Sequence, residues 1–183
     1  MTGGIGTGKS YIAGKFERMH FPVYHADDET KKLYQTAEVK NLLRDAFGEA
    51  PFSNTNIDFK KLGNLIFSNP EHLKTINKII HPIIIADFEC WAKKQSSPIV
   101  FMESALVFES AFHHIFDLLI VVNASKQKRT ERLLCRNPEF SEVEIDRRFA
   151  AQIPQEEKCR KADIMIDNEI DDTNTISYSF FTS

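Results

Sequence analysis

Apolar side chains recur every three or four positions along much of the 183-residue chain, which is the spacing that an amphipathic helix requires. Ile12, Phe16 and Met19 set the first such pattern. Asn69-Pro70 is a favourable helix start, whereas Pro82 is expected to break or kink the helix that contains it. The pattern predicts helices over residues 9–19, 27–34, 39–47, 58–66, 69–81, 83–91 and 125–136, a helix ending near 152, and another turn or two after 154.

Two continuous apolar runs, Ile99–Met102 and Leu118–Val122, are typical of parallel strands buried on both faces. Phe21–His25 and Ile164–Ile166 predict shorter strands. The pattern further predicts a loop over Glu49–Asn56 and the start of a final helix over Ile176–Phe181. Strands that alternate with helices predict an α/β fold in which an all-parallel sheet is layered between helices. No repeat or linker interrupts the chain, so a single domain over residues 1–183 is expected.

Composition narrows the choice of partners and compartment. Lys plus Arg number 23 against 26 Asp plus Glu, and this net charge of -3 argues against a nucleic-acid or membrane-surface partner. No apolar run approaches the ~18 residues of a membrane span, and no signal peptide is expected. Cys90, Cys135 and Cys159 are widely spaced and form no C-x-x-C motif, which indicates neither a disulfide framework nor a zinc site. A cytoplasmic protein is therefore expected.

The glycines cluster at the start of the chain, where residues 3–10 read G-G-I-G-T-G-K-S and match G-x-x-x-x-G-K-S/T in full. Glycines let the backbone curl until successive N–H groups converge on phosphate oxygens, and the following helix directs its positive end at the same anion. Lys9 can reach the β- and γ-phosphates, and the Ser10 hydroxyl can bind Mg²⁺. The motif predicts a nucleotide phosphate site formed by Gly4, Ile5, Gly6, Thr7, Gly8, Lys9, Ser10 and Tyr11.

Only Met1 and Thr2 precede this loop, whereas a phosphate loop normally follows a central strand of ~5–6 residues. We therefore expect the natural protein to begin about five residues upstream with a short apolar run.

A phosphate loop alone does not separate kinases from other nucleotide-binding proteins. The guanine-reading N-K-x-D motif is missing, because Asn77-Lys78 continues as Ile79-Ile80. A basic helix followed by a polar stretch that contains Pro138 suits a small-molecule kinase with a mobile lid. Arg132 and Arg136 lie four positions apart on one face of that helix, where they either neutralise phosphate charge or form a solvated surface.

The phosphate loop and six segments that follow it resemble the dephospho-CoA kinase family. Residues 2–10 look like its T-G-G-I-G-S-G-K-S almost letter for letter, and His25-Ala26-Asp27 stands at its D-A-D. The other matches, in the family's order along nearly the whole chain, are Ile80-His81-Pro82, residues 105–109, Arg132–Arg136, residues 148–152 and residues 162–168. The departures are His25 for the first aspartate, Phe59 where arginine is common, Ala105 where proline is usual, and Glu169 where glycine often follows the asparagine.

The resemblance implies ATP-dependent phosphorylation of the ribose 3′-hydroxyl of dephospho-CoA, the last step of CoA biosynthesis, with Mg²⁺ and no obligate protein partner. It implies catalytic roles for Lys9, Asp27 and Arg136, and further nucleotide contacts from Arg132, Arg148 and Asn168. Asp27, His81, Leu106 and Glu109 would meet the acceptor, residues 28–95 would form a helical substrate-binding insertion, and residues 136–150 a lid.

Each of these roles has a simpler alternative. Asp27 could be a plain helix N-cap, His81 could satisfy backbone carbonyls at the proline, and Glu109 could cap the following turn. From the residues themselves the function is a P-loop phosphotransferase. A kinase for another nucleotide-like acceptor and a non-catalytic nucleotide-binding module are the alternatives.

Overall fold

The computed structural model describes residues 1–110, 113–170 and 177–180, and it divides into two compact units. The first unit combines Met1–Val23 with Ile99–Ser183, and the second comprises Tyr24–Pro98. Across these described ranges, no helix is long and apolar enough to cross a membrane.

The first unit is built on parallel strands. β5 (Ile120–Asn123) pairs in parallel with β6 (Ile164–Asp167), with Ile120 opposite Ile164. On the other side of β5, Thr2 N–H donates to Ile120 O at 2.7 Å and Val122 N–H donates to Thr2 O at 2.8 Å. Ser104, directly after β4 (Phe101–Glu103), donates its N–H to Met1 O at 3.1 Å. Met1 and Thr2 therefore lie between β4 and β5, and the phosphate loop starts from the middle of the sheet.

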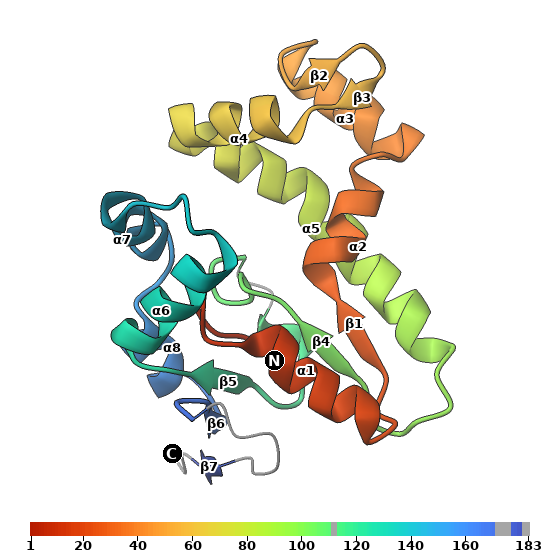
Figure 1. Ribbon diagram of the computed structural model, residues 1–183. Helices are drawn as coiled ribbons and strands as arrows, with labels where there is room; N and C mark the ends of the chain where they lie inside the picture. The colour runs from red at the N-terminus through yellow and green to blue at the C-terminus, as the bar shows by residue number, and fades with distance from the viewer. Residues whose placement is uncertain (111–112, 171–176, 181–183) are drawn as a thin grey trace. The chain divides into compact units, whose positions relative to one another are not determined.

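Helices cover both faces of these strands (Figure 1). Ile12 of α1 (Lys9–Arg18) packs in a buried cluster with Ile120, Val122 and Ile166, whereas Val121 packs with Phe108 and Ala162 in another. Neighbouring residues of a strand point to opposite faces, so these clusters are the two sides of one layered core. The described part of this unit also contains the 3₁₀ turn η1 (His113–Ile115), α6 (Lys126–Arg136), α7 (Glu142–Ala150) and α8 (Gln155–Arg160).

The second unit is mainly helical and contains α2 (Ala26–Leu33), α3 (Ala37–Phe47), α4 (Phe59–Ser68) and α5 (Pro70–Lys93). β1 (Val23–His25), a neighbour of β4 in a two-stranded sheet, runs from one unit into the other. The side chains of Thr36, Asp58 and Asn69 cap α3, α4 and α5 by accepting backbone N–H bonds. The buried core of the second unit consists of Val39, Leu43, Phe52, Ile57, Leu62, Ile76 and Ile80.

Three sequence-based expectations were wrong. The expected loop over Glu49–Asn56 contains β2 (Phe52–Ser53), which pairs antiparallel with β3 (Asn56–Ile57) because Phe52 and Ile57 are buried together. The expected division into helices 69–81 and 83–91 is also wrong, because α5 is one continuous helix that contains Pro82.

The third concerns the end of the chain, where β7 (Ser177–Phe180) forms instead of a helix and pairs antiparallel with β6. An exposed strand edge offers backbone partners that a short helix lacks. The sheet is consequently not all parallel. Ile176 and Phe181, the ends of the expected helix, lie outside the described residues.

Candidate active site

The phosphate loop connects Thr2 in the sheet to the first turn of α1, and two of its glycines have left-handed backbone conformations. Gly6 has φ 82° and Gly8, the N-cap of α1, has φ 86°. A Cβ at Gly8 would lie 2.2 Å from Asn168 Nδ2, and one at Gly6 would lie 2.7 Å from Arg129 O. The loop thus needs glycine here for its backbone angles and for the close approach of α6 and of the turn after β6.

The loop's carbonyl groups are held from within the loop and from outside it. Gly4 O accepts the Thr7 hydroxyl at 2.9 Å and the Lys9 ammonium at 3.3 Å. Thr7 O accepts Asn168 Nδ2 at 2.8 Å and Arg132 Nη1 at 3.3 Å. These bonds bring Arg132 and Asn168, both expected at the nucleotide site, directly against the loop.

Three side chains without a role in the sequence-based prediction also hold the loop. Gln155 Oε1 accepts Gly4 N–H at 2.8 Å, and Gln152 Oε1 accepts Ile5 N–H at 2.8 Å. Arg129 Nε donates to Ile5 O at 2.9 Å, and its guanidinium stacks on the Phe149 ring at 4.3 Å. Burial lowers the pKa of Arg129, which is consistent with a cation that holds the loop from inside the protein. Gln152 stood within a matched segment, but glutamine carries no distinctive spacing from which this contact could be predicted.

The remaining backbone donors of the loop form the candidate phosphate site. In the part of the chain that the structure describes, the N–H groups of Gly6, Gly8 and Ser10 have no protein acceptor. Beside them the Lys9 side chain is only 8% exposed, and all lie at the positive end of α1. Unsatisfied N–H groups, a buried ammonium and a helix N-terminus together favour a bound anion such as a phosphate.

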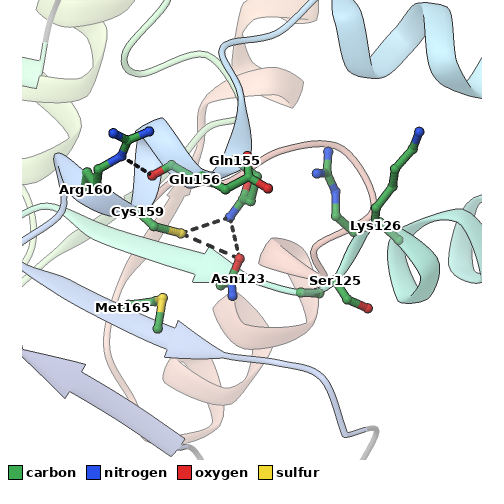
Figure 2. Close-up of a pocket in the computed structure, with 10 residues that line it drawn as sticks. Asn123, Ser125, Lys126, Gln155, Glu156, Cys159, Arg160 and Met165 are labelled. Carbon is green, nitrogen blue, oxygen red and sulfur yellow. Dashed lines mark hydrogen bonds between the residues drawn. The ribbon is translucent and has the colours of Figure 1, made fainter.

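A pocket of about 440 Å³ adjoins the loop on the side of α8, between that helix, the end of β5 and the first turn of α6 (Figure 2). Gln155 Nε2 donates to Asn123 Oδ1 at 3.2 Å and lies 3.6 Å from Cys159 Sγ. Burial raises the pKa of the Cys159 thiol, so it stays protonated at neutral pH. This network supports Gln155 where it holds the loop.

Several other predicted site residues also belong to the first unit, and their side chains are exposed. Ser10, Tyr11, Leu106 and Arg136 are exposed, and Lys15 lies 5.0 Å over the Tyr11 ring. Arg148, also exposed, pairs with Glu144 at 2.7 Å and stacks on Phe140 at 4.3 Å. The structure therefore places Arg136 and Arg148 on solvated surfaces of α6 and α7.

Glu109 has a partner inside the protein. Its Oε1 pairs with the ammonium of Lys158 at 2.6 Å, and Lys158 is 0% exposed. The same oxygen accepts Ile153 N–H at 3.1 Å, whereas the buried Oε2 has no partner in the described structure. Glu109 thus neutralises a buried cation, while its second carboxylate oxygen is buried without a hydrogen bond in the described structure.

Asp27 and His81 belong to the second unit. Asp27 is exposed in the first turn of α2, whose N-cap is His25, so the plain N-cap interpretation of Asp27 is wrong. A carboxylate in a first helical turn is stabilised by the helix dipole. His81 is half-buried on α5, and this burial lowers the pKa of its imidazole, which is therefore neutral at pH 7.

No group of three His, Cys, Asp or Glu side chains that could hold a metal ion occurs among residues 1–110, 113–170 and 177–180. Mg²⁺ in phosphotransferases keeps several waters and takes few protein ligands beside the phosphates. The exposed Ser10 hydroxyl, next to the candidate phosphate donors, fits that mode of binding.

Comparisons with known proteins identify the family to which the chain is similar. A model of the dephospho-CoA kinase family matches residues 1–173. The dephospho-CoA kinase of Bacteroides fragilis (strain YCH46) is 36% identical over 171 residues, which cover 92% of this chain and 83% of that protein. The dephospho-CoA kinase of Bacillus cereus (strain ATCC 10987 / NRS 248) is 33% identical over 175 residues, with 92% and 86% covered.

Solved structures extend the match to the fold. The crystal structure of TT1252 from Thermus thermophilus superposes with a TM-score of 0.83 at 29% identity, over 93% of this chain and 87% of that one. Dephospho-CoA kinase from Campylobacter jejuni superposes with a TM-score of 0.63 at 26% identity, over 92% and 86%. With the family model covering residues 1–173 and the phosphate loop in place, this chain belongs to the dephospho-CoA kinase family.

Proposed function

We propose that this chain transfers the γ-phosphoryl group of ATP to the ribose 3′-hydroxyl of dephospho-CoA and so forms CoA. The observation that carries the proposal is the phosphate loop, in which the N–H groups of Gly6, Gly8 and Ser10 have no protein acceptor beside the buried Lys9, within the part of the chain described. Membership of the family supplies the acceptor.

The phosphate loop and Lys9 would bind the ATP phosphates. Because the N–H groups are held in place before ATP arrives, they stabilise negative charge without reorganising during transfer. The Lys9 ammonium would neutralise charge on the γ-phosphoryl group, since its bond to Gly4 O at 3.3 Å holds it at the loop. The Ser10 hydroxyl would help to hold Mg²⁺, which when bound neutralises charge on the phosphates.

On the acceptor side, Asp27 would orient the 3′-hydroxyl and accept its proton. Its carboxylate is exposed in the first turn of α2, where a substrate can approach it. His81, Leu106 and Glu109 would contact dephospho-CoA, with the neutral imidazole of His81 as a hydrogen-bonding group. The substrate-binding insertion expected over residues 28–95 falls entirely within the second compact unit, Tyr24–Pro98.

Arginines near the expected lid would balance phosphate charge. Arg132 and Asn168 already hold the loop through Thr7 O, which supports a role on the nucleotide side. Arg136 and Arg148 are exposed on helices that flank the polar residues 137–141, and they would reach the phosphates when this segment closes. Amide hydrogen exchange over residues 136–142 is therefore expected to slow on ATP binding. Exchange that is equally slow with and without ATP would contradict a lid.

The activity is tested with purified protein, ATP and Mg²⁺ in a coupled assay for ADP release. Dephospho-CoA is compared with adenosine, AMP and other nucleosides at equal concentration. We expect a value of kcat/KM for dephospho-CoA at least 100-fold above that for any other acceptor, and ³¹P NMR should show a 3′-phosphomonoester. Faster turnover of another nucleoside would favour a related kinase, and ATP binding without turnover would favour a non-catalytic module.

A further inference from the structure

Glu169 follows Asn168 in the turn after β6, and its carboxylate binds the start of α6. Glu169 Oε2 accepts Ser125 N–H at 2.7 Å, and Oε1 accepts the Ser125 hydroxyl at 2.6 Å. Ser125 is the N-cap of α6, where the helix dipole favours a carboxylate. The two bonds from Ser125 hold the pKa of Glu169 below its usual range, so the side chain is ionised at neutral pH.

In the same turn, both the backbone N–H and the backbone C=O of Asn168 are hydrogen-bonded. Glu169 N–H donates to Asp167 Oδ1 at 3.1 Å, and Asn168 N–H donates to Asn123 O at 2.8 Å. Arg132 Nη2 donates to Asn168 O at 2.7 Å. The turn is therefore attached to α6 at two places, the N-cap through Glu169 and the Arg132 side chain through Asn168.

The side chain of Asn168 connects this turn to the phosphate loop. It is 5% exposed, and its Nδ2 donates to Thr7 O at 2.8 Å. In a trans peptide the C=O and the next N–H point in opposite directions. A Thr7 carbonyl that faces Asn168 therefore turns the Gly8 N–H away from Asn168, and within the described structure that N–H has no protein acceptor.

We propose that Glu169 is a positioning residue for the nucleotide phosphates, because its bonds to Ser125 fix the turn from which Asn168 orients the Thr7–Gly8 peptide. The inference rests on the proposed function, since it assigns Glu169 to the ATP side of the reaction. Glycine often stands at this position in the family that the chain resembles. A glycine cannot bind Ser125 through a side chain, so the contact depends on the glutamate at position 169.

The test measures nucleotide affinity separately from turnover. Calorimetric titration with a non-hydrolysable ATP analogue and Mg²⁺ gives Kd for the wild type, Glu169→Gln and Glu169→Gly. Glu157→Gln is the matched control, because Glu157 is an exposed carboxylate of the same unit that pairs only with Lys161 at 2.6 Å in the described structure. Steady-state assays of the same proteins give kcat and the KM values for ATP and dephospho-CoA.

Glu169→Gly is expected to raise Kd for the analogue about 5- to 10-fold. This corresponds to the loss of roughly one charge-assisted hydrogen bond. Glu169→Gln keeps an acceptor for Ser125 N–H, so its increase in log Kd should be about half that of Glu169→Gly. KM for ATP should rise in parallel, KM for dephospho-CoA should stay within about twofold, and the control should match the wild type.

A double-mutant cycle separates positioning from stability. In an Asn168→Ala background, Glu169→Gly should change Kd by less than about twofold, because the side chain that transmits the effect is gone. Unchanged Kd in both Glu169 variants, equal rises of both KM values, or an undiminished effect without Asn168 would each overturn the inference. Wild-type protein that bound the analogue but did not phosphorylate dephospho-CoA would overturn the proposed function instead, and the affinity cycle would still decide the role of Glu169.

Discussion

Replacing Gly8 by alanine would disturb the phosphate loop in two ways that can be measured separately. With φ at 86°, an alanine there costs about 1 kcal/mol in backbone conformation. The new Cβ would also lie 2.2 Å from Asn168 Nδ2, so Asn168 must move and its bond to Thr7 O is lost. An unsatisfied buried amide adds about 1–3 kcal/mol, which gives a total of about 2–4 kcal/mol.

Thermal unfolding followed by circular dichroism measures this loss. For a domain of this size, about 2–4 °C of Tm corresponds to 1 kcal/mol, so Tm should fall by roughly 5–15 °C. The control is Gly14→Ala in α1, where the nearest atom to an added Cβ, Arg18 Nη1, is 3.7 Å away. Alanine favours a helix interior over glycine, so this control should raise Tm by a few degrees.

Asn168→Ala provides the second half of the test. In this background the new Cβ no longer collides with the Asn168 amide. Gly8→Ala should then lower the free energy of unfolding by only about 1 kcal/mol, the cost of the backbone conformation. The reasoning is refuted if Gly8→Ala is as mild as Gly14→Ala, or if its cost is the same with and without the Asn168 side chain.

Three further predictions concern catalysis, the buried ion pair and pH. Lys9→Ala should lower kcat by at least about 100-fold, whereas Asp27→Asn should lower kcat and leave Kd for ATP within about twofold, as measured by steady-state kinetics and calorimetry. Glu109→Gln leaves the Lys158 ammonium, 0% exposed, without its carboxylate, and should cost about 3 kcal/mol in urea unfolding. Burial lowers the pKa of His81, so unfolding takes up a proton as pH falls below about 6.5. The urea midpoint should consequently fall more between pH 7 and pH 5 in the wild type than in His81→Leu.

Each of these has a control and a contradicting result. Lys31→Ala and Asp28→Asn remove an exposed pair of α2 and should keep activity; a near-normal kcat in Asp27→Asn would exclude its role as acceptor base. Glu157→Gln removes the surface partner of Lys161 and should cost under about 1 kcal/mol; an equal loss in Glu109→Gln would show that the buried pair contributes no more than a surface pair. Parallel pH profiles of the wild type and His81→Leu would contradict the titration of His81.

The amino-acid sequence by itself determined what depends on near neighbours in the chain. The phosphate loop is eight consecutive residues, and the caps at Asp58, Asn69 and Ser125 bond to N–H groups two or three residues ahead. Strand positions followed from continuous apolar runs, although Ile99 and Leu118 are exposed and the strands begin only at Phe101 and Ile120. Interactions over so few residues involve little loop closure, so local residue types decide them.

Only the tertiary structure decided which distant side chains hold the loop. Gln155 and Gln152 bind N–H groups 151 and 147 residues away along the chain, and Glu169 binds Ser125 across 44 residues. The antiparallel pairing of β7 likewise depends on β6, because a strand edge supplies backbone partners that no local pattern encodes. A glutamine or glutamate has the same chemistry wherever it stands, and its role is determined by what the folded sheet brings within 3 Å of it.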